Sequence, residues 1–194
     1  MTQSSASAPY GEGMDRDLVI AAQRGDEEAF AMLAVVHGAR LQAVAHRILR
    51  DFDLAEDATQ AALLRIWKSL PRLRDPDRFE AWSYQLLVRS CHAEARRTRR
   101  WMPGLRLVET DEPTEDPLVA IADRDQLERA FRSLSVDHRA VVVLHHYLDL
   151  PLTEVAETLG ISVGTAGSRL HYAMKGLHAA LDAAARPALQ EALR

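Results

Sequence analysis

Very little in this sequence supports a disulfide framework, a membrane span or a cysteine-based metal centre. Among 194 residues only Cys91 is a cysteine, so it has no partner for an internal disulfide and no second thiolate for a metal. No run approaches the roughly 18 apolar residues that cross a bilayer. Residues 1–14 contain no hydrophobic signal-peptide core. These absences predict a cytoplasmic protein.

The sequence also lacks the short motifs that mark common enzyme classes. It has no His-Glu-x-x-His metal motif, no Walker loop, no dinucleotide-binding glycine fingerprint and no nucleophile elbow. His138, His145 and His146 have no further ligands at a metal-binding spacing. We therefore expect no enzymatic activity, no metal and no cofactor.

Positive charge is scarce overall but concentrated locally. The net charge is -4, which excludes a protein that holds duplex DNA through its total charge. Residues 89–101 nevertheless contain five arginines and one acidic residue, whereas residues 103–128 contain eight acidic residues and two arginines. A basic helix therefore precedes an acidic segment. A solvated charged face beside a linker also explains this pattern, and that alternative stays open here.

Alanine and leucine dominate what is present. The chain has 31 Ala and 26 Leu, both strong helix formers, which predicts an all-α fold. Apolar residues recur at steps of three and four through residues 15–101, as in four helices of a compact bundle. Asp53 with Glu56, and Asp77 with Glu80, have the spacing that predicts two helix starts.

Composition divides the chain into two small helical domains. Residues 103–122 contain three prolines and no sustained period, which predicts a flexible acidic linker. We therefore expect a disordered arm over 1–14, a first domain over 15–102, a second domain over 123–185 and a tail over 186–194.

The most informative stretch, residues 152–177, reads LTEVAETLGISVGTAGSRLHYAMKGL. A short helix ends at Gly160, which suits a left-handed turn, and Ser162 can cap the next helix. This spacing is typical of a helix-turn-helix, whose second helix enters the major groove. An ordinary helical hairpin is the alternative for this stretch taken alone.

Taken together, these segments resemble an extracytoplasmic-function (ECF) sigma factor, the two-domain class of the bacterial sigma-70 family. The resemblance rests on LAEDATQAALLRIWKSL (54–70), FEAWSYQLLVRSCHAEARR (79–97) and GTAGSRLHYA (164–173). It implies a four-helix region 2, a region 4 helix-turn-helix, and a subunit that binds core RNA polymerase and promoter DNA. It also adds an anti-sigma factor as a candidate partner.

The resemblance further implies roles for particular side chains. Core polymerase would be bound through Asp57, Gln60 and Arg65. The minus-10 element would be engaged by the loop 71–78 and by the basic helix with Arg89, Arg96, Arg97, Arg99 and Arg100. The minus-35 element would be contacted by Thr165, Ser168, Arg169, Tyr172 and Lys175, with Arg169 expected to face DNA. Asp57, Gln60 and Arg65 match the family motif in position, Arg169 lies in the stretch that matches the recognition helix, and the five arginines of the basic helix fit their role by their charge.

Four residues depart from the family pattern. Ser83, Arg89 and Ala93 stand where a Leu, an Asn and an Asp are common, which leaves the minus-10 preference open, and Gly167 replaces a basic residue. Two other functions stay open at this point: a stand-alone helix-turn-helix regulator and a helical interaction protein without a DNA partner.

Overall fold

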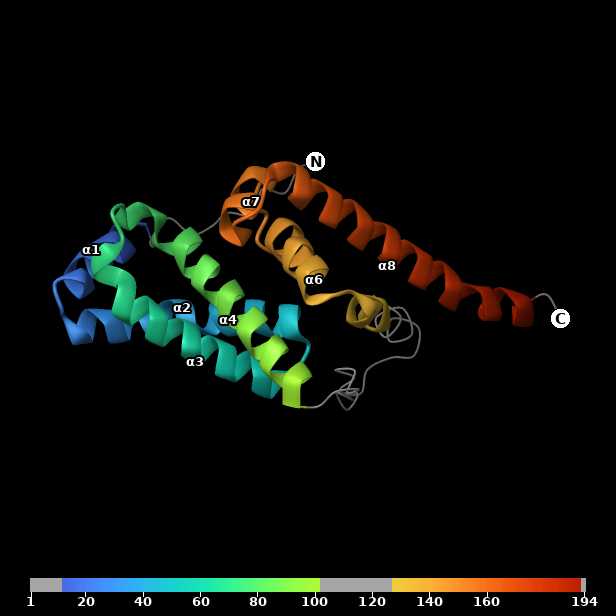
Figure 1. Cartoon of the computed structure of the whole chain (residues 1–194), viewed down its shortest axis with the longest axis horizontal. Coiled ribbons are helices and arrows are strands. Elements are labelled where there is room, and N and C mark those ends of the chain that lie inside the picture. Colours follow the sequence, from blue (N-terminus) through green and yellow to red (C-terminus); the bar gives the residue numbers. More distant parts are fainter. Residues whose placement is uncertain (1–11, 102–126, 193–194) are drawn as a thin grey trace.

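Two helical units lie side by side in the described part of the chain (Figure 1). The computed structural model describes residues 12–101 and 127–192, and every regular element within these ranges is helical. The expected linker at 103–122 and most of the expected arm lie outside the described residues. The first helix begins at residue 12, slightly before the boundary expected at 15.

The first unit contains the four helices that the apolar period predicts. They are α1 (Glu12–Gln23), α2 (Glu27–Leu49), α3 (Phe52–Ser69) and α4 (Phe79–Trp101), with two short 3-10 turns, η1 (Leu70–Arg72) and η2 (Pro76–Arg78), before α4. Helix α3 packs against both α2 and α4. Ala55, Ala58 and Ala62 of α3 are fully buried, and their small side chains let the neighbouring helices approach closely.

Neither expected helix start is correct: Asp53 does not cap α3, and Asp77 lies inside η2 rather than at the start of α4. The N-cap of α3 is Asp51, whose carboxylate accepts a hydrogen bond from the Leu54 amide at 2.7 Å. Asp75 plays the same part for η2 by accepting from the Asp77 amide at 3.1 Å. An N-cap needs an extended backbone, which Asp51 and Asp75 have, with φ of -150° and -120°. Asp53 is already inside α3.

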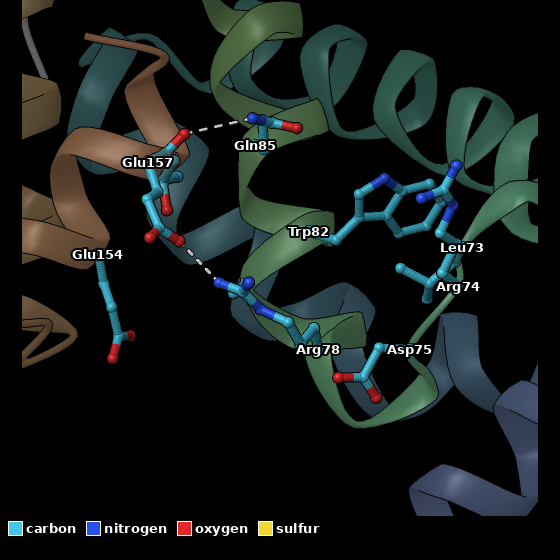
Figure 2. A pocket seen from close by; sticks show the side chains of 10 residues that line it. Leu73, Arg74, Asp75, Arg78, Trp82, Gln85, Glu154 and Glu157 are labelled. Carbon is cyan, nitrogen blue, oxygen red and sulfur yellow. Dashed lines mark hydrogen bonds and ion pairs between the residues drawn. The ribbon is translucent and has the colours of Figure 1, made fainter. Parts of the chain in front are cut away.

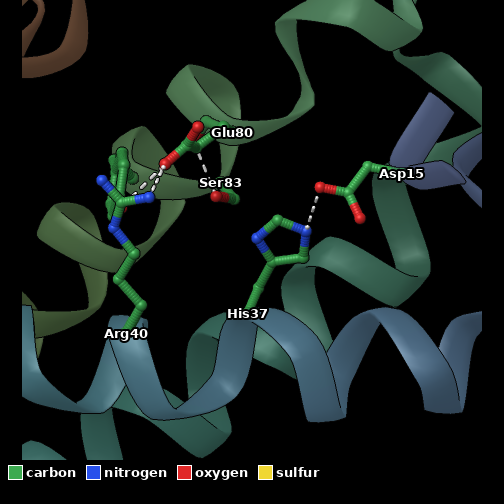
Figure 3. A network of polar contacts seen from close by, with 6 residues as sticks. Asp15, His37, Arg40, Glu80 and Ser83 are labelled. Atoms are coloured by element: carbon green, nitrogen blue, oxygen red, sulfur yellow. Dashed lines mark hydrogen bonds and ion pairs between the residues drawn. The ribbon is translucent and has the colours of Figure 1, made fainter. Parts of the chain in front are cut away.

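Polar contacts connect α1, α2 and α4 at one end of the first unit (Figure 3). Asp15 lies 3.5 Å from the His37 imidazole, and the Arg40 guanidinium contacts Glu80 at 2.8 Å. The Ser83 hydroxyl donates to the Glu80 carbonyl at 2.7 Å. Because exposed ion pairs contribute roughly 0 to 1 kcal/mol each, we attribute most of the stability of this unit to its apolar core.

The second unit places a short helix pair on one long helix. After a helical stretch at 127–133 come α6 (Val136–Val142), a π-helical turn η3 (Val143–Tyr147), α7 (Leu152–Leu159) and α8 (Val163–Ala192). Helix α8 therefore continues through most of the expected tail at 186–194. The residues of its own small core are Ala130, Leu134, Val142, Ala173 and Leu177.

The two units share an apolar interface. Helix α7 packs against α4, and α6 packs against α2. Val141, Leu144 and Val155 are fully buried in the same cluster as the core of the first unit. At the edge of this interface, the Arg47 guanidinium lies 3.8 Å from the centre of the Tyr147 ring, a cation–π contact.

Candidate nucleic-acid interface

One face of α4 and the turn before it forms a stripe of polar and basic side chains, which we call the α4 stripe. Its members recur at steps of three, four and seven residues, so they lie along one side of the helix. They are Arg78, Trp82, Gln85, Arg89, Arg96 and Arg100. Arg89, Arg96 and Arg100 are exposed, and Arg99 is exposed beside them. This arrangement can follow a phosphate backbone.

Arg97 does not belong to the stripe, although sequence reasoning grouped it with the other arginines. Its guanidinium turns toward α3 and contacts Asp57 at 2.8 Å, and it also contacts Glu94 at 2.7 Å. Two carboxylates therefore already neutralise this cation. The structure thus brings one residue expected to bind DNA against one expected to bind polymerase.

The loop before α4 borders a cleft of about 490 Å3 between the two units. Figure 2 shows Trp82 between this loop and the body of α4, with Leu73 and Arg74 on one side of its ring. Trp82 is half-buried and packs on the core. One side of the indole ring lines the cleft, and the ring supports the loop.

The three residues expected to bind polymerase do not form one patch. Gln60 lines a separate apolar groove on the α2–α3 side, with Glu27, Phe30, Leu63, Leu64 and Trp67. Asp57 and Arg65 lie on the α4 side of the helix, where Arg65 donates to the Ser90 hydroxyl at 2.7 Å. Sequence reasoning missed Leu64, whose 60% exposure in an otherwise apolar helix marks an uncovered surface.

The helix-turn-helix forms as the residues predict. Gly160 ends α7 with φ 67° and ψ 37°, the left-handed conformation that glycine adopts without strain. The Ser162 hydroxyl accepts a hydrogen bond from the Thr165 amide at 3.1 Å, so it caps α8 as expected. Ala166 and Ala173 are fully buried against the rest of the unit.

Four of the five side chains expected at the minus-35 element lie on the outer face of α8. Thr165, Ser168, Tyr172 and Lys175 are all exposed. His171 is also exposed and its ring lies 5.6 Å from that of Tyr172, so it joins this face although sequence reasoning left it out. The face has no acidic residue between positions 161 and 178, which suits contact with a polyanion.

Arg169 is the exception, because it does not face solvent as expected. Its guanidinium lies 3.4 Å from the Asp137 carboxylate of α6, and its side chain is 28% exposed. The cause is α6 of the same unit, which packs against α8 and brings Asp137 to this side of it, and sequence spacing does not reveal this packing. A Cβ at Gly167 would lie 3.4 Å from the end of the Leu152 side chain, an ordinary contact, so packing does not explain the glycine at this position.

Neither the cysteine nor the histidines form a chemical centre among the described residues. Burial raises the pKa of the Cys91 thiol to about 12, which makes this thiol unreactive at neutral pH. Within residues 12–101 and 127–192, no three His, Cys, Asp or Glu side chains gather as metal ligands. None of the helices in these ranges has the length and apolar content of a membrane span.

Comparison with known proteins assigns both units. Residues 33–101 match the Sigma-70 region 2 family, and residues 124–177 match Sigma-70 region 4. The ECF RNA polymerase sigma factor SigL of Mycobacterium tuberculosis is 33% identical over 75% of this chain and 85% of its own length. This chain belongs to the ECF sigma-70 family.

Other relatives are similar to this sigma factor over most of its length. The RNA polymerase sigma-H factor of Pseudomonas aeruginosa is 26% identical over 92% of this chain and 97% of its own. The solved structure of CnrH in complex with the cytosolic domain of CnrY has a TM-score of 0.64 and 25% identity, covering 88% of this chain and 98% of CnrH.

The matches decide between the functions that the sequence left open. A stand-alone regulator or a helical interaction protein needs no region 2, whereas a sigma factor uses both regions. The protein is therefore an RNA polymerase sigma factor, a regulatory subunit of the transcription machinery. The fold class and the family expected from the sequence are confirmed, while the roles of individual side chains stay predictions.

Proposed function

We propose that this sigma factor binds core RNA polymerase in the cytoplasm through the α2–α3 side of region 2 and directs it to promoters through two DNA-reading faces. The α4 stripe, with the loop 71–78, engages the minus-10 element as its strands separate. The outer face of α8 contacts the minus-35 element. The observation that carries this proposal is the alignment of exposed arginines along one side of α4.

The stripe suits separated strands better than duplex DNA. A row of cations tracks a single phosphate backbone, and aromatic rings beside such a row offer a stacking surface for bases. Extruding a base costs a few kcal/mol, and least where the strands have already parted. Trp82 and the loop 71–78 border the cleft at one end of the row, which is the place for such a base.

The groove around Gln60 is the surface that we assign to polymerase. Phe30 and Trp67 form its floor, with ring centres 4.7 Å apart. Aromatic and aliphatic side chains in a shallow groove with a polar rim are typical of interface centres. An anti-sigma factor is a second candidate partner, since the sigma factor RpoE was solved with the anti-sigma factor NepR from Bartonella quintana.

Adjacent arginines of α4 provide the test. Arg96→Ala should reduce promoter opening in runoff transcription with core polymerase, and should lower the salt slope of holoenzyme binding to a separated-strand probe by about 0.7. Arg97→Ala removes the same charge one residue away and should leave that slope unchanged, because Asp57 and Glu94 hold Arg97.

Core binding by both variants should equal that of the parent, measured by native gel shift. Equal salt slopes for Arg96→Ala and the parent would contradict the assignment of the stripe to DNA. So would a larger loss of promoter opening in Arg97→Ala than in Arg96→Ala.

A further inference from the structure

The last residue of α1 holds the start of the loop that precedes α4. The side-chain amide nitrogen of Gln23 donates one hydrogen bond to the Leu70 carbonyl at 3.2 Å and another to the Leu73 carbonyl at 2.6 Å. These carbonyls lie 47 and 50 residues further along the chain. Both hydrogens of the amide group are used in this way. Gln23 therefore joins the first helix of region 2 to the start of the loop 71–78.

Gln23 is itself held in place by the end of α1. Val19 and Ala22, the buried residues near this end, belong to the core of region 2. The chain then turns at Gly25, whose φ is 95°, and the Gly25 amide donates to the Ala22 carbonyl at 3.0 Å. The amide group of Gln23 thus reaches the loop from a helix end that both packing and the turn hold.

A second contact from α1 holds the other end of the same loop. The Arg16 guanidinium lies 3.1 Å from the Asp77 carboxylate in η2. Arg16 and Gln23 are seven residues apart, so both lie on one side of α1. Because both side chains of the ion pair are at least half exposed, it is the weaker of the two contacts. Between the two contacts lies Arg74, which lines the cleft.

The shape of this loop decides what the cleft accepts. Ordering a free segment when a ligand binds costs conformational entropy for each residue that becomes fixed. Leu73 and Arg74 lie beside the Trp82 ring (Figure 2). The carbonyl that Gln23 holds at 2.6 Å therefore belongs to a residue at the edge of the cleft. Holding this residue before a base arrives lowers the entropic cost of binding the base.

We propose that Gln23 is a positioning residue for base capture, which holds the loop 71–78 in the shape that accepts an extruded base of the minus-10 element. The inference rests on the proposed function, because it takes this loop as the place where the base binds. Gln23 acts through Leu73, whose carbonyl it holds and whose side chain lines the cleft. A carboxylate at position 23 has no hydrogen to donate and repels both carbonyl oxygens.

The test measures how much one base contributes to binding, with and without the Gln23 hydrogen bonds. Holoenzyme is mixed with fluorescent single-stranded oligonucleotides that carry the minus-10 element of a promoter it transcribes, and each position in turn is made abasic. In the parent, loss of the captured base should weaken binding about five-fold or more, as expected for a stacked base. In Gln23→Glu the same abasic site should weaken binding less than about two-fold. The effects at the other positions should stay as in the parent.

Two further variants show whether hydrogen-bond donation is the cause. Gln42→Glu is the matched control, since it makes the same change at a partly buried position of α2, and it should keep the full abasic effect. Gln23→Lys should keep most of the effect, because an ammonium group also donates to both carbonyls. A variant that was only less stable would bind all the oligonucleotides less tightly alike, so the ratio between them would not change.

The outcomes separate this proposal from the proposed function. An abasic effect in Gln23→Glu equal to that in the parent would overturn the proposal and leave the assignment of the stripe to DNA intact. So would a loss of the effect in Gln42→Glu or Gln23→Lys as large as in Gln23→Glu. If no abasic position weakened binding by the parent, the loop 71–78 would capture no base, and this part of the proposed function would fall together with the inference.

Discussion

At the scale of single residues, the neighbours of each arginine decide what it can do. Arg89, Arg96 and Arg100 point to solvent, Arg97 is held by two carboxylates, and Arg169 is held by Asp137. The sequence predicted all of them as DNA contacts, the arginines of α4 because of their clustered charge and Arg169 because it lies in the stretch that matches the recognition helix. Sequence spacing places a side chain on a helix face, but it does not show which carboxylate another helix brings to that face.

Arg169 provides a prediction at this scale. Its planar guanidinium can grip a guanine edge with two hydrogen bonds, whereas Lys175 presents a point charge. Arg169→Ala should therefore weaken transcription from minus-35-dependent promoters by about 1 to 3 kcal/mol, and should relax the preference at one base pair. Lys175→Ala should weaken all sequences alike. Runoff transcription on a promoter and its minus-35 variants checks this, with core binding measured in parallel.

Full activity and unaltered sequence preference in Arg169→Ala would show that the assigned reading face of α8 is wrong. A uniform loss across all promoter variants would instead assign Arg169 to a phosphate.

At the scale of elements, the apolar period predicts the helices well and their ends less well. The four helices of region 2, the turn at Gly160 and the Ser162 cap are confirmed. The start at Asp53 is wrong, because the chain turns earlier, at Arg50, whose φ is 59°. The start at Asp77 is wrong because Asp77 lies inside η2, which Asp75 caps. The π-helical turn at Val143–Tyr147 was not predicted. Such a turn holds one residue more than an α-helical turn, and whether it forms depends on how the preceding helix α6 packs.

Two glycines of the helix-turn-helix provide a prediction at this scale. Gly160→Ala should lower the free energy of unfolding by about 1 to 2 kcal/mol, because a Cβ is strained in the left-handed region. Gly164→Ala should raise it by up to about 1 kcal/mol, since Gly164 lies in α8 and the nearest atom to an added Cβ is 3.9 Å away. Urea denaturation followed by circular dichroism measures both. Destabilisation by Gly164→Ala equal to that of Gly160→Ala would contradict this account of the turn.

At the scale of the whole molecule, the contact between the two regions is the feature that the sequence did not reveal. The acidic linker predicts two separate domains. The spacing of apolar residues along each helix predicts that its apolar side packs against another element, but not which element that is. Val141, Val155 and Ala156 of region 4 are buried in the core cluster of region 2. Which element covers which depends on shape and charge across both regions, so a single sequence leaves it undetermined.

His92 predicts how this contact depends on pH. Burial between the regions lowers its pKa below the ordinary 6.5; Arg96 and Arg169 lower it further, while Asp137 opposes them. The neutral imidazole is therefore the form that the contact between the regions favours. Its contribution to this contact is fully present above about pH 6.5 and is lost as the pH falls through the lowered pKa.

Energy transfer between dyes placed on Lys68→Cys in α3 and His178→Cys in α8, both exposed positions, should therefore decrease on acidification from about pH 7.5 to 5.5. His92→Gln cannot be protonated in this range, and its curve should fall less steeply. Superimposable curves for the parent and His92→Gln would assign the pH response to other groups.

The ion pair between Asp57 and Arg97 joins the helix that carries the polymerase groove to the helix that carries the stripe. Glu94 holds the same guanidinium. Arg97 therefore keeps its partners when DNA lies along the stripe, and DNA binding takes nothing away from Asp57. By thermodynamic reciprocity, polymerase bound at the groove then leaves the affinity of the stripe for DNA unchanged through this pair. The free energies of the two binding events should add without a coupling contribution from it.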